Sequence, residues 1–135
     1  MQQVPQQKIT TFLMFDGQAG DAMNFYVSLF PDGEVLSLVR YGADGPGVEG
    51  TIEHAAFSIA GQQFMCSDSN VKQSFGFTPS MSLYIECETA DEMGRLYDAV
   101  AAHGELLMPL DSYGFSTRFA WVQDRYGVSW QLNLK

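Results

Sequence analysis

The chain has 135 residues, of which 46% are hydrophobic and 13% aromatic, and its formal net charge at pH 7 is −9. The length suits one domain, and the apolar content excludes a disordered or low-complexity chain. The negative charge disfavours nucleic acid and anionic membrane surfaces, because phosphate groups would be repelled. No stretch reaches the about 20 continuous apolar residues of a membrane helix. We therefore expect a cytoplasmic globular protein with no nucleic-acid or membrane partner, and a ligand that is neutral or cationic.

The chain opens on a polar segment, residues 1–7, which has no apolar core and reads as a tail rather than a signal peptide. Residues 8–15 form an apolar, β-branched run that predicts a strand ending at Asp16-Gly17. A helix is then predicted from the spacing of Ala22, Phe25, Tyr26 and Leu29, and it stops at Pro31-Asp32-Gly33. Three strands follow, at residues 34–41, 52–59 and 62–67, with a glycine-rich loop at 42–50.

After a polar linker over residues 68–79, the same order of elements recurs. Residues 80–87 predict a strand, and Thr89 with Glu92 forms a capping box at the start of a helix. An apolar stripe runs along this helix and ends at His103-Gly104; it consists of Met93, Leu96, Tyr97, Val100 and Ala101. Three further strands are predicted near residues 105–108, 117–123 and 128–134.

The two halves match in residues as well as in element order. Phe25-Tyr26 and Gly33-Glu34 recur 71 residues later as Leu96-Tyr97 and Gly104-Glu105, which indicates a duplication. The order βαβββ, present twice, excludes a doubly wound parallel sheet. We predict an α+β fold of two βαβββ modules whose mixed sheets curl around a cleft. They form a single domain over residues 8–134, with repeats at 8–68 and 80–134.

Four segments carry a family resemblance: residues 9–16, 22–31, 54–68 and 124–131. On these residues the chain resembles the PhnB-like branch of the vicinal oxygen chelate superfamily, which includes glyoxalase I, bleomycin-resistance proteins and ring-cleaving dioxygenases. That branch often carries the label 3-demethylubiquinone 3-methyltransferase. The resemblance implies a glyoxalase/bleomycin-resistance fold and a homodimer, and the open edges of curled sheets give a physical reason for pairing.

In metal-dependent members of the superfamily, four strand positions hold a divalent ion. The resemblance places these positions at Thr11, Met65, Ser80 and Gln131. A hydroxyl, a thioether and an amide are poor ligands for Zn, Ni, Mn or Fe(II), which prefer imidazole, carboxylate or thiolate. We therefore expect no metal and no cofactor. The chain is also too short for the parallel sheet that holds S-adenosylmethionine in the common methyltransferases, so we treat the branch's label as an inherited name.

His54 is the candidate catalytic residue, as a general base or as a group that binds an acid. The alternative is a structural histidine, bonded to a backbone carbonyl at a strand edge. The candidate ligand-binding residues are polar or aromatic side chains on predicted strands, together with one methionine. They are Thr11, Met65, Ser67, Ser80, Trp121 and Gln131. Other aromatic residues on these strands, Phe64, Tyr84, Phe119 and Trp130, are divided between the cleft and the core, and the core is favoured for any single one.

Cys66 and Cys87 stand inside apolar runs, which favours two buried reduced thiols over a disulfide or a catalytic thiol. The function that follows is binding of a small organic molecule in a cleft without a catalytic metal. The alternative is a metal-dependent or His54-assisted enzyme, namely a lyase, a dioxygenase or a transferase that includes the methyltransferase of the branch's label.

Overall fold

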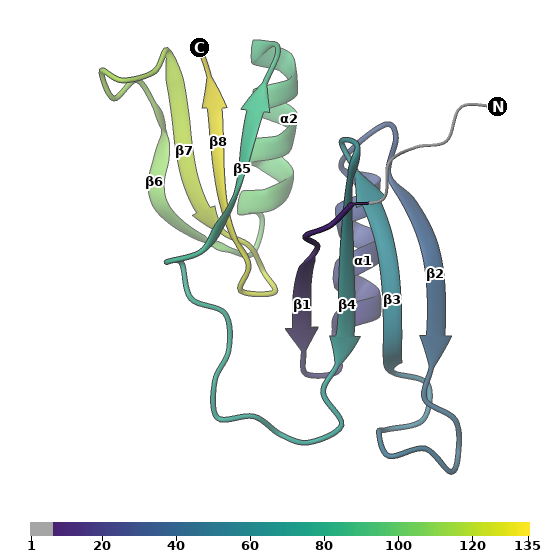
Figure 1. Ribbon diagram of the computed structural model, residues 1–135. Helices are drawn as coiled ribbons and strands as arrows, with labels where there is room; N and C mark the ends of the chain where they lie inside the picture. The colour runs from purple at the N-terminus through teal and green to yellow at the C-terminus, as the bar shows by residue number, and fades with distance from the viewer. Residues whose placement is uncertain (1–6) are drawn as a thin grey trace, which may run out of the picture. The chain divides into compact units, whose positions relative to one another are not determined.

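The computed structural model describes residues 7–135, which form two compact units divided between Ser74 and Phe75. Figure 1 shows the same order of elements in each unit. Unit 1 contains β1 (Thr11–Phe15), α1 (Ala19–Ser28), β2 (Glu34–Arg40), β3 (Ile52–Ile59) and β4 (Gln62–Asp68). Unit 2 contains β5 (Ser82–Cys87), α2 (Ala90–Ala101), β6 (Glu105–Asp111), β7 (Arg118–Gln123) and β8 (Ser129–Leu134).

Each unit holds one four-stranded mixed sheet, with the strand orders β1-β4-β3-β2 and β5-β8-β7-β6. In both sheets the first strand pairs in parallel with the last, and the remaining pairs are antiparallel. This topology confirms the predicted α+β fold of two βαβββ modules. The assignment of both modules to a single domain stays a prediction. Neither helix within residues 7–135 is long and apolar enough to span a membrane.

The limits of three strands differ from the prediction by more than one residue. The first begins at Thr11 instead of residue 8, the fifth begins at Ser82 instead of residue 80, and the sixth continues to Asp111. Gln7, which the prediction assigned to the tail, is tied to β4: its amide donates to the backbone oxygen of Gln63 and accepts from the backbone amide of Gln63. The rest of the predicted tail, residues 1–6, lies outside the described residues.

The core of unit 1 forms between α1 and one face of its sheet. Ala22, Met23 and Tyr26 are buried on the helix, and Tyr26 packs against the Phe57 ring at a centroid distance of 6.2 Å. Phe57 in turn stacks on Phe64 of the neighbouring strand at 5.3 Å. The helical spacing seen in the sequence therefore marks the side of α1 that contacts the sheet.

Unit 2 repeats this arrangement with a different set of side chains. Met93, Leu96 and Val100 of α2 are fully buried, as are Trp130 and Leu132 of β8. The predicted capping box is present, since the Thr89 hydroxyl accepts from the Glu92 amide at 3.1 Å and the Glu92 carboxylate accepts from the Glu88 amide at 2.7 Å. These two bonds satisfy amides that a helix start would otherwise leave without a partner.

The glycine shared by the two repeats is required by close packing. A Cβ atom at Gly33 would lie 1.9 Å from the Val27 carbonyl oxygen, and one at Gly104 would lie 2.3 Å from the Gln123 carbonyl oxygen. In unit 2 the left-handed residue after the helix is His103, with φ of 60°, and not the glycine. The glycine of the repeated Gly-Glu pair is needed because the chain between helix and strand lies against a backbone carbonyl group in each unit.

Each unit has one buried aspartate that holds backbone amides. Asp68 accepts from the Ala19 amide at the start of α1 and from the Ile52 amide at the start of β3, both at 2.9 Å. Asp124 accepts from the amides of Tyr126 and Val128 in its own turn, and from the Trp130 indole at 2.8 Å. Asp68 therefore supplies the N-terminal cap that Gln18, the residue before α1, does not provide.

We predict that Asp68→Asn lowers the free energy of unfolding by about 2–3 kcal/mol, because an amide donor would face one of two buried backbone N–H groups. Urea denaturation followed by circular dichroism measures this change. Asp44→Asn, in an exposed loop, is the matched control and should leave stability unchanged. A loss at Asp68→Asn no larger than the loss in the control would contradict this role of Asp68.

Candidate functional site

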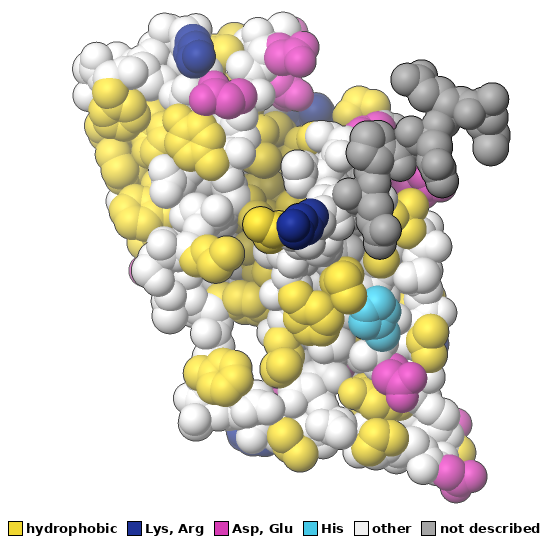
Figure 2. All heavy atoms as spheres, in the orientation of Figure 1, with side chains coloured by type: hydrophobic (Ala, Val, Ile, Leu, Met, Phe, Trp, Pro, Cys, Tyr) yellow, Lys and Arg dark blue, Asp and Glu magenta, His cyan; other side chains and the backbone are white. Residues whose placement is uncertain are grey.

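In each unit the single helix covers one face of the sheet and leaves the other uncovered (Figure 1). Figure 2 is drawn from the same side and shows hydrophobic side chains on the uncovered faces. Side chains alternate between the two faces along a strand, so burial and register assign each residue to one of them. The uncovered faces are where side chains remain available to bind a ligand.

On the uncovered face of unit 1, β4 places Met65 and Ser67 between residues of β1 and β3. Met65 is in register with Phe12 and with Ala56, and Ser67 is in register with Met14. Phe12 and Met14 are 47% and 40% exposed. This face is therefore mostly apolar.

Thr11 lies on the opposite face of the same sheet. It is in register with the buried Phe64, and Leu13, two residues further on and so on the same face, is buried as well. Thr11 therefore lies on the opposite face of the sheet from Met65 and Ser67, although the sequence predicts all three as ligand-binding residues. Phe12, the next residue, takes the place on the uncovered face.

His54 lies on the uncovered face of unit 1, on the inner strand β3. It alternates with the buried Ala55 and is in register with Val39 of β2. Its imidazole lies 6.3 Å from the Phe12 ring, measured between centroids, with an interplanar angle of 49°. β3 is flanked by β2 and β4, so His54 does not lie on an edge strand. The half-buried imidazole is thus held beside an aromatic ring.

The uncovered face of unit 2 carries a hydrogen-bonded group of polar side chains that spans three strands. The Ser82 and Ser129 hydroxyls lie 2.7 Å apart, and the Trp121 indole donates to Ser129 at 2.9 Å. Gln131 donates to Ser82 at 3.3 Å and is in register with both Tyr84 and Trp121. We call Ser82, Trp121, Ser129 and Gln131 the polar group of unit 2.

Ser80 lies outside this polar group. It is exposed, precedes β5, and its hydroxyl is 2.7 Å from that of Thr78. The serine that contacts Gln131 is Ser82, because β5 begins two residues later than the sequence indicated. A shift of two residues keeps the same alternation of faces, so the sequence pattern predicts Ser80 in the place that Ser82 occupies.

A second set of contacts lies beside the polar group, towards the end of β8. The Asn133 amide donates to the Glu86 carboxylate at 3.0 Å, and the Ser116 hydroxyl donates to the Asn133 side-chain oxygen. Phe119, in register with Asn133, is buried under a cluster of rings. The rings around it are Tyr84 at 6.4 Å, Tyr113 at 6.2 Å and Phe115 at 5.0 Å.

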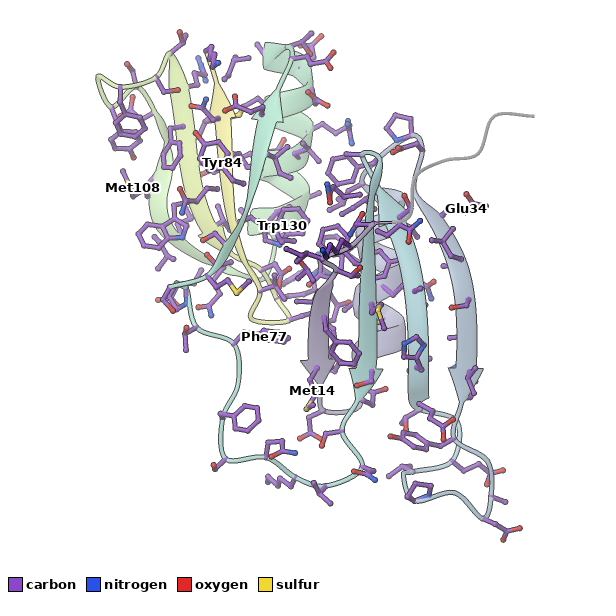
Figure 3. All side chains as sticks on the ribbon, viewed as in Figure 1. Met14, Glu34, Phe77, Tyr84, Met108 and Trp130 are labelled. Carbon is purple, nitrogen blue, oxygen red and sulfur yellow. The ribbon has the colours of Figure 1, made fainter. Side chains whose placement is uncertain are left out.

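The outer sides of this ring cluster are open to solvent. Tyr84, labelled in Figure 3, is 52% exposed, and Phe115 is 65% exposed. Partial desolvation, and then the Glu86 carboxylate, raise the pKa of Tyr84 above its usual value. Tyr84 therefore keeps its proton throughout the neutral range and presents a ring and a hydroxyl beside a fixed carboxylate.

The five aromatic residues that the sequence analysis singled out divide as follows. Phe64 and Trp130 belong to the cores against the helices, where Trp130 is fully buried. Tyr84, Phe119 and Trp121 lie on the uncovered face of unit 2. Several residues of this face were missed, namely Ser82, Glu86, Ser129 and Asn133. The signal for them is the alternation Ser82-x-Tyr84-x-Glu86 and Ser129-x-Gln131-x-Asn133 on two paired strands.

The residues at the superfamily's metal positions do not suit a divalent ion. Thr11, Met65, Ser80 and Gln131 provide neither imidazole nor carboxylate nor thiolate. Ser80 lies outside its strand, and the Gln131 amide is bonded to Ser82. Within residues 7–135, no three His, Cys, Asp or Glu side chains gather in a way that could hold a metal ion.

The two cysteines are free and buried, as expected. Burial, and then the Asp68 carboxylate, raise the pKa of Cys66 to about 11. Burial, and then Glu92 and Glu86, raise the pKa of Cys87 to about 11 as well. Both thiols stay protonated at neutral pH, which disfavours a catalytic thiolate.

Comparisons with known proteins agree with this architecture. A family model described as 3-demethylubiquinone-9 3-methyltransferase matches residues 7–133. The solved structure of the PhnB protein from Bacillus cereus is 56% identical, with a TM-score of 0.94, and the match covers 96% of this chain and 100% of that one. Protein YjdN of Escherichia coli (strain K12) is 27% identical over 143 residues, which cover 93% of this chain and 94% of YjdN.

A more distant structure shares the fold alone. It is a glyoxylase/bleomycin resistance protein/dioxygenase domain from Frankia sp. EAN1pec, which is 13% identical, with a TM-score of 0.66 over 97% of this chain and 93% of that one. The chain belongs to the 3-demethylubiquinone-9 3-methyltransferase family and to its PhnB-like branch, and it shares the fold of the glyoxylase/bleomycin resistance protein/dioxygenase domain.

Proposed function

We propose that the protein binds a small organic molecule against the uncovered faces of its sheets, without a catalytic metal. The observation that carries this proposal is the polar group of unit 2, which lies beside exposed aromatic rings. Hydroxyl and amide groups held in fixed positions on a partly apolar surface are typical of ligand sites, where a few polar atoms orient the ligand. The cleft predicted from the sequence stays part of this proposal.

The chemistry of the unit 2 face favours a neutral or cationic ligand that has a flat apolar part. Tyr84 and Phe115 offer exposed ring surface for stacking. The Glu86 carboxylate, positioned by Asn133, would attract a cation and repel an anion. The net charge of −9 acts in the same direction at longer range.

A thermal-shift screen of metabolites, drugs and metal ions tests the proposal. We expect organic molecules that carry an aromatic or other flat apolar group to raise the melting temperature. The screen should include S-adenosylmethionine, because the family's description names a methyltransferase. A shift with S-adenosylmethionine or with a metal ion alone would favour the enzymatic alternative, and the absence of any organic hit would overturn the proposal.

We predict that the double substitution Ser82→Ala, Gln131→Ala weakens binding of a screened hit by about tenfold or more, since two hydrogen-bonding groups are removed. Titration calorimetry with that hit measures the loss. Ser80→Ala is the matched control, because Ser80 is exposed and contacts Thr78 instead of Gln131. A loss with Ser80→Ala and none with the double variant would contradict the polar group of unit 2 as the binding site.

We predict a substoichiometric content of divalent metal in protein purified without chelator, because the donor atoms at the superfamily's metal positions bind such ions poorly. Plasma mass spectrometry of the protein and of its dialysis buffer measures this content. Nickel, zinc, manganese or iron at one ion per chain would contradict the proposal of a metal-free site.

A second candidate function is an enzyme that uses His54 as a general base, favoured by the position of this imidazole on the uncovered face of unit 1. If this candidate holds, His54→Gln abolishes turnover of a hit ligand while the thermal shift remains, because glutamine lacks a basic nitrogen. Turnover is measured by mass spectrometry of the ligand after incubation. Equal turnover in both proteins would exclude His54 as the base.

The proposed partner is a second copy of this chain. The edge strands of both open sheets give the physical reason, because their outer backbone groups remain available for pairing. Light scattering after size exclusion should give about twice the mass of one chain.

A further inference from the structure

One row of side chains crosses the sheet of unit 2 from edge to edge on its uncovered face. Glu86 of β5 is in register with Asn133 of β8. Asn133 is in register with Phe119 of β7, and Phe119 with Asp111 of β6. The two ends of the row are exposed carboxylates, and its centre is a buried aromatic ring. The row lies two residues along β8 from Gln131, and so beyond the polar group of unit 2.

The exposed ring of Phe115 is held against this row. It meets the Phe119 ring at a centroid distance of 5.0 Å and an interplanar angle of 73°, and it stacks on the Tyr113 ring at 6.2 Å. The hydroxyl of the next residue, Ser116, donates to the Asn133 side-chain oxygen. Because these contacts position the ring in the absence of a ligand, binding against it costs little conformational entropy.

Glu86 is a carboxylate fixed beside an exposed ring. It lies two residues from Tyr84 on the same face of β5, and the Asn133 amide donates to its Oε2 atom at 3.0 Å. After desolvation, the Glu86 carboxylate is the second cause of the raised pKa of Tyr84, so its charge acts directly on that ring. An ionised carboxylate can accept about four hydrogen bonds. The bond from Asn133 therefore leaves Glu86 able to pair with a cation.

The charged strand residues on the uncovered face of unit 2 are all acidic. They are Glu86, Asp111 and Glu105, the last in register with Gln123 at the other end of the sheet. Arg118, the one basic residue in β5, β6, β7 and β8, is in register with Leu134, on the side of α2. The face therefore attracts cations and repels anions.

We propose that this end of the unit 2 face binds an organic ammonium group, with its positive charge beside Glu86 and its N-bound carbon atoms against the rings of Tyr84 and Phe115. The face of an aromatic ring attracts a cation, and the carbon atoms of an alkylated ammonium group bury apolar surface on the same ring. The inference rests on the proposed function, because it names the class of ligand for the same face.

An inorganic cation suits this end of the face poorly. Aromatic rings offer no oxygen ligands, whereas Ca²⁺ takes about six to eight. Glu86 and Asp111 belong to the two outermost strands, β5 and β6, which are three strand spacings or about 14 Å apart. Two carboxylates at that separation cannot share one ion. The rings next to Glu86 therefore favour an organic cation over a metal ion.

A pair of probes that differ only in charge tests this inference. Choline carries a trimethylammonium group, and its uncharged isostere is the same alcohol with a tert-butyl group. In titrations followed by nuclear magnetic resonance, we expect choline to bind about fivefold more tightly than the isostere, since only choline pairs with Glu86. Added salt should weaken the binding of choline and leave that of the isostere unchanged. Equal or tighter binding of the isostere would overturn the inference.

Two variants test the residues. Glu86→Gln should weaken choline binding about threefold or more and remove its salt dependence, because the charge is lost while the shape is kept. Glu105→Gln is the matched control, since it makes the same change of charge at the other end of the face. Phe115→Leu should also weaken binding about threefold, because it removes a ring. Its control is Phe75→Leu, since Phe75 is 68% exposed and Phe115 65%. Equal losses in variant and control would overturn the assigned contacts.

A further variant tests the sign of the ligand's charge. Lys135 follows β8 and would attract an anion to the same end of the sheet. Lys135→Gln should leave choline binding unchanged or strengthen it. Hits from the thermal-shift screen that are all neutral or anionic, or that are lost with Lys135→Gln and kept with Glu86→Gln, would overturn this inference and leave the proposed function standing. The absence of any organic hit, choline included, would overturn both.

Discussion

The structure depends on one constraint: a βαβββ module has a single helix, and its sheet has two faces. In each unit the helix and the buried face of the sheet form the core, with Tyr26 and Phe57 in unit 1 and Leu96 and Trp130 in unit 2. The second face receives no cover from a helix. The side chains of this face contact each other, solvent, a ligand or a partner. The proposed binding function depends on which of these contacts they make.

The two units carry different side chains on the face that has no helix. Unit 1 presents an apolar surface with Phe12 and Met14 and one imidazole, that of His54. Unit 2 fixes its polar side chains through one another and covers Phe119 with neighbouring rings. The outer edges have diverged as well, since β6 contains Pro109 and β2 has no such residue. The two units share one topology, while their uncovered faces carry different side chains.

Periodicity and turn residues were sufficient to predict the order of elements and the two-fold repetition, because both depend on neighbours in the sequence. The candidate site was predicted less completely. The sequence pattern predicts Ser80 where Ser82 contacts Gln131, and it groups Thr11 with residues of the other face, because the face of a residue depends on where the strand begins. The contact between Asn133 and Glu86 joins residues 47 apart, and it follows from the parallel register of β5 and β8, which no local pattern encodes.

The two buried aspartates imply an order of folding. Asp124 binds groups two to six residues away, so its contacts form as soon as the β7–β8 turn closes. Asp68 joins amides 16 and 49 residues away, and these bonds require β1, α1 and β3 to be in place already. Loop-closure entropy delays contacts of high sequence separation. These separations predict that the turn of unit 2 forms early in folding and that the Asp68 contacts form late in unit 1.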